Sequence, residues 1–271
     1  MVLKKIYLES LEKLFNLYKK DRYVSNPFYI LFCGYSNKRY SGIFLRDEIY
    51  ANEFPFLGLP KNKREWKNAI RGLISEEELS ILKRKSIKIE KTVEIKEEFY
   101  YSTKNLIELK GKDFHDFRKA INRFRKRYKF KVMYDYPKEK ILRFMDNWAK
   151  NQKEKTKMFE SARKYAKFCV IVKDKFPNAN WIFIEIDKKL VGYCCSIRLS
   201  NLLWVGVHQK VDYNYVGLSR FLIYERIKQF VDVPFFTLGS GVDGGITQFK
   251  ESLRPIKKAR RYFRVTGDNE E

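Results

Sequence analysis

The chain has 271 residues, of which 44% are hydrophobic and 16% aromatic. This excludes a largely disordered protein and allows one large domain or two of ordinary size. Lys and Arg number 57 against 33 Asp and Glu, a formal net charge of +24. Such an imbalance favours polyanionic partners: nucleic acid, an anionic membrane surface or a phosphate-bearing cofactor. A Lys-rich surface of purely compositional origin is the alternative.

Cysteine and histidine usage argues against disulfides and against a metal centre. The cysteines, which form no CxxC motif, are Cys33, Cys169, Cys194 and Cys195. We expect reduced thiols in a cytoplasmic protein. The two histidines, His115 and His208, lie far apart in sequence, so no metal site is expected. The N-terminus lacks a signal-peptide pattern and no apolar run reaches membrane-spanning length, so no integral membrane segment is expected.

The first 95 residues predict a mixture of short elements. The expected helices are 6–18, 63–71 and 76–85, and the expected strands are 28–33, 40–45, 48–50 and 87–95. A strongly basic helix follows over 113–128. Its apolar face carries Phe117, Ile121, Phe124 and Tyr128, and its other faces are crowded with Arg and Lys.

The rest of the chain alternates between strands and helices. We expect strand 130–134, a helix from Pro137, helix 161–176, a hairpin of strands 181–186 and 190–199, strand 202–210, helix 217–231, strand 234–238, helix 244–253 and strand 259–265. This order predicts an α+β fold with a mixed, mainly antiparallel sheet flanked by helices.

The turn before helix 217–231 has features that suit a phosphate. A helix N-terminus offers unpaired N–H groups and a positive dipole end. Asn214, Gly217 and Ser219 form an N-x-x-G-x-S pattern, with Arg220 next. Gly217 would allow close approach, Ser219 could donate a hydrogen bond, and Arg220 adds charge. An ordinary strand–turn–helix junction explains the same residues.

Three sequence motifs resemble a known family. They are YYSTKNLIELKGKDFHDFRKAINRF (Tyr100–Phe124), HQK with YVGLSRFLIYE (within Val207–Glu225), and FTLGSGVDGGITQFKESLRP (Phe236–Pro255). Together they resemble the phosphatidylglycerol lysyltransferase C-terminal domain family and, more distantly, the Fem-type peptidyltransferases. The strand–helix order and the 214–219 turn also resemble GNAT acyltransferases. The chain departs from the family pattern at Lys119, Gln209 and Leu238–Gly239, and from the GNAT loop at Asn214 and Ser219.

The resemblance implies tandem GNAT-like units, divided here into 1–135 and 136–271. It implies transfer of an aminoacyl group from aminoacyl-tRNA to an amine or hydroxyl acceptor, with no tightly bound cofactor. Two alternatives stay open: an N-acyltransferase that uses acetyl-CoA or another acyl-CoA, and a non-catalytic RNA-binding protein on the same fold. The expected partners are tRNA and, peripherally, an anionic membrane; the acceptor is not indicated.

The candidate site residues fall into three groups. Candidate catalytic residues are Lys250, His208, Asp243 and Glu225. Candidate donor or phosphate ligands are Asn214, Gly217, Ser219, Arg220, Gly244, Gly245 and Arg254. Candidate contacts to tRNA or substrate are His115, Arg118, Lys119, Asn122, Arg123, Arg125 and Lys126.

Each proposed catalytic residue also has a structural interpretation. Lys250 is a candidate for oxyanion stabilisation or a solvated cation, and Asp243 for binding an amino group or capping a helix. His208 is a candidate base or a structurally bonded histidine. Strand alternation places His208 on one face with Trp204, Gly206 and Lys210. An ion pair is favoured over catalysis for Glu225.

Overall fold

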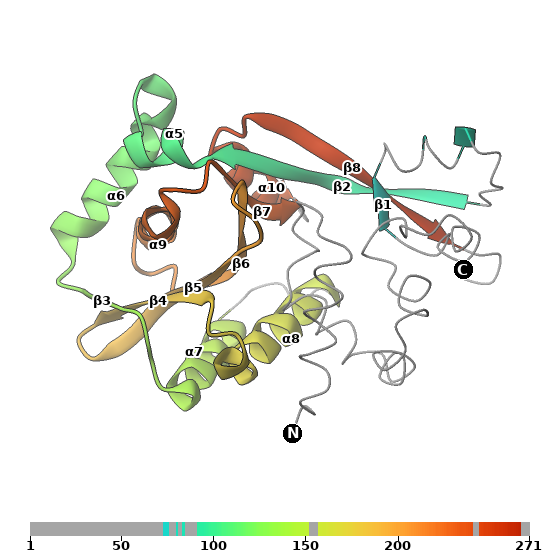
Figure 1. Ribbon diagram of the computed structural model, residues 1–271. Coiled ribbons are helices and arrows are strands. Elements are labelled where there is room, and N and C mark those ends of the chain that lie inside the picture. The colour runs from blue at the N-terminus through green and yellow to red at the C-terminus, as the bar shows by residue number, and fades with distance from the viewer. Residues whose placement is uncertain are drawn as a thin grey trace. The chain divides into compact units, whose positions relative to one another are not determined.

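The computed structural model describes residues 73–75, 80, 83–84, 91–151, 157–240 and 244–266 (Figure 1). The elements expected between residues 6 and 71 lie outside these residues, and those expected at 76–85 and 87–95 are described only in part. The chain forms two compact units. One comprises Met1–Phe99, Gly239–Gln248 and Lys257–Glu271, and the other comprises Tyr100–Leu238 and Phe249–Ile256.

In the first unit, three strands lie in the order β1, β8, β2. They are β1 (Leu73–Ser75), β8 (Lys257–Thr266) and β2 (Lys91–Ser102). β1 pairs antiparallel with β8, with Ile74 opposite Phe263. β8 confirms the strand expected at 259–265, whereas β2 runs seven residues past the expected end at 95.

In the second unit, the end of β2 is followed across the sheet by β7, β6, β5, β4 and β3. These strands are β7 (Phe235–Ser240), β6 (Leu203–Val211), β5 (Lys189–Arg198), β4 (Ala179–Ile186) and β3 (Lys131–Met133). β3 to β6 pair antiparallel, and β6 pairs parallel with β7. The mixed, mainly antiparallel α+β sheet predicted from sequence is confirmed. Its repetition in tandem stays a prediction.

Helices cover both faces of this sheet: α6 and α9 lie on one side, α7 and α8 on the other (Figure 1). The second unit contains α5 (Thr103–Glu108), α6 (His115–Arg127), α7 (Lys138–Lys150), α8 (Lys157–Ile171), α9 (Leu218–Ile227) and the 3-10 turn η6 (Lys228–Phe230). Phe124 of α6 stacks on Phe221 of α9, with ring centroids 4.7 Å apart. The apolar face that the sequence predicted for the basic helix therefore lies in the hydrophobic core.

Two further expectations concern organisation. The boundary expected at 135/136 does not coincide with the division into units, because residues 100–135 lie in the same unit as 136–238. Among the helices that the structure describes, none is long and apolar enough to cross a membrane.

β6 and β7 are firmly joined at the end where both strands begin. The paired residues are Leu203 with Phe235, Trp204 with Phe236 and Val205 with Thr237. The fully buried Trp204 stacks on Phe236 at 4.4 Å and on Phe230 at 4.8 Å. Its Nε1 donates a hydrogen bond to Oγ1 of Thr103 at 3.2 Å. Backbone pairing and aromatic stacking thus meet at the Trp204–Phe236 pair. We call this region the paired end.

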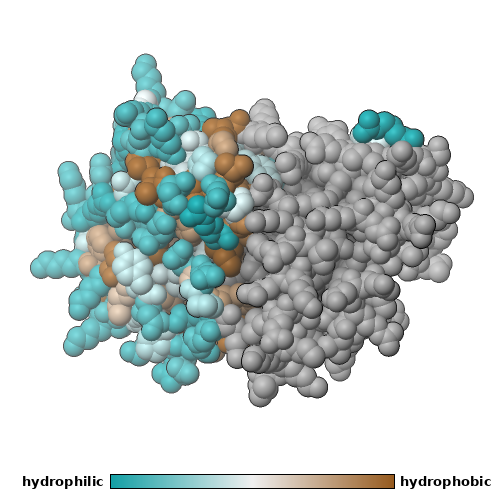
Figure 2. Space-filling model, in the orientation of Figure 1, coloured by the Kyte–Doolittle hydropathy of each residue, from teal (hydrophilic) through white to brown (hydrophobic). Residues whose placement is uncertain are grey.

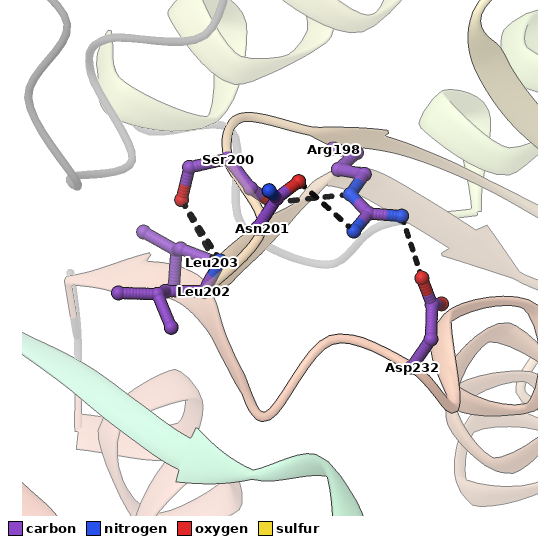
Figure 3. Close-up of polar contacts among 6 residues, drawn as sticks. All are labelled: Arg198, Ser200, Asn201, Leu202, Leu203 and Asp232. Atoms are coloured by element: carbon purple, nitrogen blue, oxygen red, sulfur yellow. Dashed lines mark hydrogen bonds and ion pairs between the residues drawn. The ribbon is translucent and has the colours of Figure 1, made fainter.

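Polar contacts tie the loops at the paired end (Figure 3). Arg198 donates from Nη1 to Oδ2 of Asp232 at 2.6 Å and from Nε to the carbonyl of Ser200 at 3.2 Å. The Ser200 hydroxyl oxygen accepts from the N–H groups of Leu202 and Leu203. One arginine therefore joins the β5–β6 turn to the segment that leads into β7.

Candidate active site

Beyond Val205 and Thr237 the backbone pairing of β6 with β7 stops, and cationic side chains bind carbonyls on each strand. Arg226 of α9 donates from Nη2 to the His208 carbonyl at 2.8 Å. Lys250 of α10 (Gly244–Glu251) donates from Nζ to the Leu238 carbonyl at 2.6 Å. We call this region the open end. At this end the His208 and Leu238 carbonyls each accept a hydrogen bond from a cationic side chain.

Glycine at position 206 makes room for the arginine. A Cβ there would lie 2.3 Å from Nη1 of Arg226 and 2.4 Å from Cδ2 of Leu238. Arg226 is 2% exposed, its Nε has no hydrogen-bond partner, and no carboxylate within the described residues forms an ion pair with it. A buried charge without a counter-charge is costly and marks functional sites.

Sequence reasoning missed Arg226, although a signal was present. It lies four residues after Leu222 and three after Ile223, so it falls on the apolar face of α9, where a cation is unexpected. The adjacent Glu225 was singled out for the same reason, whereas Arg226 was not among the candidates.

A β-bulge decides where His208 points. The register between β5 and β6 shifts between Cys195 and Ser196, which pair with His208 and Gly206 and leave Val207 as an extra residue. Gly206 consequently faces Arg226 of α9, whereas His208 lies against Tyr165 of α8. The expectation that Trp204 and Gly206 share a face with His208 is wrong, because one inserted residue reverses the alternation. His208 and Lys210 do share a face, as expected.

His208 lies among aromatic rings. Its centroid is 5.4 Å from that of Tyr193, 5.5 Å from Trp181 and 6.4 Å from Tyr165. Both ring nitrogens are buried and have no hydrogen-bond partner among the residues described. Burial, followed by the charges of Lys210 and Arg226, lowers the pKa of His208 well below its usual value. The imidazole is therefore neutral near pH 7.

The charge of Lys210 acts on this ring from the α7–α8 side. Its Nζ lies 4.1 Å from the ring centroid of Trp148 in α7, a cation–π distance. Burial lowers the pKa of Lys210 to about 8. Tyr193, which is fully buried, has its pKa raised by the same loss of water, so its hydroxyl stays protonated.

The other candidates near Lys250 are placed as follows. The Lys250 carbonyl accepts a hydrogen bond from the Tyr101 hydroxyl at 3.0 Å. Gly244 and Gly245 are exposed at the start of α10. Arg254 is exposed and forms an ion pair with Asp113 at 3.3 Å. Asp243 lies outside the described residues.

The residues of the turn before α9 pack against, and hydrogen-bond to, other residues of the protein. Gly217 has φ +89°, and a Cβ there would lie 2.3 Å from the Ala120 carbonyl of α6. Arg220 donates to the carbonyl of Asp116 at 3.1 Å, and the Ser219 hydroxyl oxygen accepts from Gln209 at 3.0 Å. Asn214 donates its backbone N–H to Oδ1 of Asp212 at 3.0 Å. Close packing of α6 on α9 explains Gly217 without a phosphate. Phosphate binding by this turn stays a prediction.

The basic helix α6 presents an exposed cationic surface. Its exposed candidates are His115, Lys119, Asn122, Arg123, Arg125 and Lys126. Arg118 differs, because it donates to the carbonyls of Leu109 and Gly111 and so holds the loop before the helix. His115 contacts Asp116 at 3.3 Å. Hydrophilic residues cover most of the described surface visible in Figure 2, including the region of α5 and α6.

Glu225 links this surface to α9. Its buried carboxylate pairs with Arg125 of α6 at 3.4 Å and with Lys228 at 2.8 Å. The guanidinium of Arg125 also lies over the rings of Phe221 and Tyr224. Glu225 thus forms the ion pair that was favoured from sequence.

Comparison with known proteins identifies the relationship. Residues 62–265 match the family model described as phosphatidylglycerol lysyltransferase, C-terminal. The chain belongs to this family. The match confirms the resemblance read from the three sequence motifs, and family and fold together support an acyltransferase. No curated protein sequence matches the chain.

Solved structures of three similar proteins show the same fold. A conserved protein of unknown function from Bacteroides thetaiotaomicron has a TM-score of 0.62 and 17% identity, over 71% of this chain and 68% of that one. The C-terminal domain of a candidate lysylphosphatidylglycerol synthetase from Agrobacterium fabrum has a TM-score of 0.54 and 14% identity, over 79% and 77%. L-PGS from Bacillus licheniformis has a TM-score of 0.53 and 13% identity, over 78% and 76%.

Two of this chain's departures from the pattern of the phosphatidylglycerol lysyltransferase family fall at the site. Gln209 donates to both the hydroxyl and the carbonyl of Ser219, so it fixes the start of α9. Leu238 supplies the carbonyl bound by Lys250. The third departure, Lys119, is exposed on α6.

Proposed function

We propose that this protein is an aminoacyltransferase that moves an aminoacyl group from aminoacyl-tRNA to an amine or hydroxyl acceptor at the open end of β6 and β7. Membership of the phosphatidylglycerol lysyltransferase C-terminal family supports group transfer. The observation that carries the choice of donor is the exposed cationic surface of α6, fixed to α9 by the buried Glu225.

The charge of α6 suits an RNA backbone. Lys119, Arg123 and Lys126 recur every three or four residues, so they line one side of the helix and are exposed. Phosphate contacts by such side chains supply most of the sequence-independent affinity for nucleic acids. The net charge of +24 adds long-range attraction for a polyanion.

The same geometry argues against acyl-CoA as donor. An exposed helix N-terminus would be needed to hold a pyrophosphate. Here the first turn of α9 packs against Ala120, and Arg220 and Ser219 already bond to protein groups. A tRNA donor does not need this turn, because its phosphates can contact α6.

In the proposed reaction, the acceptor nitrogen or oxygen attacks the carbonyl carbon of the ester that joins the aminoacyl group to the terminal ribose. The bond to the acceptor forms and gives a tetrahedral oxyanion. In this proposal Lys250, whose Nζ bonds to the Leu238 carbonyl, stabilises this negative charge. The neutral His208 accepts the acceptor's proton and returns it to the departing ribose oxygen. Since aminoacyl-tRNA is made in the cytoplasm, the proposal includes a cytoplasmic location for this domain.

A transfer assay tests the proposal. The purified full chain would be incubated with mixed radiolabelled aminoacyl-tRNA, or with labelled acetyl-CoA, in the presence of a cell extract that supplies acceptors. We expect label to leave aminoacyl-tRNA faster than by spontaneous hydrolysis and to appear in a product. Transfer from acetyl-CoA alone, or tRNA binding without any transfer, would refute the aminoacyltransferase.

Charge reversal separates the tRNA surface from general electrostatics. We expect the triple variant Lys119→Glu/Arg123→Glu/Lys126→Glu to weaken tRNA binding at least about tenfold at 100 mM salt, since each phosphate contact contributes to a steep salt dependence. Lys140→Glu/Arg143→Glu/Lys150→Glu, which reverses three exposed cations on α7, is the control with the same charge change. Equal losses in both variants would contradict a specific role of α6.

A further inference from the structure

His208 lies between two cations, Lys210 and Arg226. Lys210 is near the ring on the α7–α8 side, and Arg226 bonds to the His208 carbonyl on the α9 side. No ion pair connects either cation to an Asp or Glu within the described residues. Both positive charges also act on the imidazole. Most buried cations in proteins are paired, so two unpaired ones around a single residue indicate that a negative charge is missing.

Several polar atoms at the same place lack partners. Nδ1 and Nε2 of His208, and the hydroxyl of the fully buried Tyr193, form no hydrogen bond with the residues described. Tyr193 and His208 are close neighbours, with ring centroids 5.4 Å apart. Buried polar groups are nearly always hydrogen-bonded, and several exceptions at one place indicate a binding site for a ligand.

The hydrogen-bonding groups of this site indicate the chemical class of the ligand. The Tyr193 hydroxyl, one N–H of His208 and the Lys210 ammonium are hydrogen-bond donors, and only the second imidazole nitrogen must accept. Three donors, of which the Lys210 ammonium is positively charged, suit the oxygens of an anion. The remaining imidazole nitrogen suits an adjacent N–H or O–H group. Lys210 and His208 are only partly buried, so the site has access to solvent.

We propose that Tyr193, His208 and Lys210 bind an oxyanionic group, a carboxylate or a phosphate, carried by the acceptor next to the amine or hydroxyl that is acylated. The anion accepts hydrogen bonds from Tyr193 and Lys210, and the neighbouring nucleophile donates its proton to His208. This assignment of the acceptor rests on the proposed function. The anion site itself does not, since it can be measured without any donor.

Histidine NMR tests the site directly, because the full chain has only two histidines. In protein labelled with ¹⁵N-histidine, the exposed His115 and buried His208 give separate signals, assigned with His115→Gln. Titration with acetate, or with inorganic phosphate, is compared with sodium chloride at equal ionic strength. We expect a saturable shift of the His208 signal that chloride does not produce. The anion that saturates at lower concentration identifies the acceptor as a carboxylate or a phosphate compound.

Two variants make the test decisive. Lys210→Met should raise the dissociation constant for the anion at least about tenfold, whereas Lys189→Met, which removes an exposed cation from the β4–β5 turn, should leave it unchanged. Tyr193→Phe retains the ring and should weaken binding severalfold, and it serves if Lys210→Met does not fold. Absence of a saturable shift in the wild type, or equal binding by Lys210→Met and the wild type, would overturn the site. If the wild-type chain binds the anion but transfers no aminoacyl group, the anion site stands and the proposed function is contradicted.

Discussion

The two ends of the β6–β7 pair are built from different interactions. At the paired end, three residues of each strand are hydrogen-bonded along the backbone, and Trp204 stacks between Phe230 and Phe236. At the open end the backbone pairing of β6 with β7 stops. There Arg226 binds the His208 carbonyl and Lys250 binds the Leu238 carbonyl. Apolar packing gives a strand pair stability, whereas buried cations cost stability and provide chemistry.

This contrast explains why both kinds of interaction occur on one strand. The paired end keeps β6 in place, so that the open end can hold unsatisfied polar groups without unfolding locally. The buried polar atoms of Tyr193 and His208 that have no hydrogen-bond partner lie on β5 and on β6 beyond Val205, and Nε of Arg226 lies on α9 beside them. The following variants alter one end at a time and are ordered by expected effect.

Gly206→Ala is expected to damage the open end most. The added Cβ would lie 2.3 Å from Nη1 of Arg226, so the guanidinium must leave its position and the His208 carbonyl loses its donor. Overpacking together with a lost charged hydrogen bond should lower the free energy of unfolding by about 3 kcal/mol. Urea denaturation measures this value. Gly244→Ala, where a Cβ would meet nothing within 4 Å, is the control and should change stability little.

Lys210→Met should change how stability depends on pH. The pKa of Lys210 is lowered to about 8 by burial, below its value of 10.5 in an unfolded chain. Between these values the unfolded state binds more protons, so stability rises with pH. With allowance for partial exposure, we expect about 2 kcal/mol of this rise to disappear in the variant. Urea denaturation from pH 7 to 10.5 measures it, and a curve parallel to that of the wild type would contradict the buried cation.

Lys250→Ala tests the chemistry of the open end. Its amine binds the Leu238 carbonyl, at the place where we propose that the oxyanion forms. Loss of a contact made in the transition state should reduce aminoacyl transfer at least about tenfold, with a smaller effect on tRNA binding. Lys189→Ala, on the exposed β4–β5 turn, should transfer at the wild-type rate. A wild-type rate in Lys250→Ala would remove this residue from the mechanism.

The ion pair at the paired end should contribute least. Arg198 and Asp232 are 2.6 Å apart, but their side chains are 41% and 59% exposed, so water screens their attraction. A double-mutant cycle with Arg198→Ala and Asp232→Ala should give a coupling free energy of about 0.5 kcal/mol. A coupling several times larger would mean that the paired end also depends on charge, and would weaken the contrast between the ends.

Much of the second unit could be predicted because its elements have simple periodicity. The apolar spacing of Phe117, Ile121 and Phe124 predicted α6 and its buried face, and alternating residues predicted β4, β5 and β6. The parallel pairing of β6 with β7 follows from the helix between them. These features depend on residues close in sequence, which is why one sequence was sufficient.

The candidate site was predicted less well because it depends on contacts between distant residues. Alternation cannot reveal the bulge at Cys195 and Ser196, and so it assigned Gly206 and His208 to the same face. Arg118 and Arg220 were interpreted as ligands because they are basic, but they bind carbonyls of the protein. Charge in a sequence indicates that partners exist, and only the fold shows whether these are internal.

Two adjacent residues of α9, Glu225 and Arg226, contact different parts of the molecule. Glu225 points to Arg125 on the basic helix, and Arg226 points to the His208 carbonyl. A single peptide unit therefore couples the surface that we assign to the nucleic acid with the strand that holds the reacting groups. Any rotation of α9 must turn both side chains together, and under the proposed function this would carry the effect of nucleic-acid docking on α6 to the His208 carbonyl.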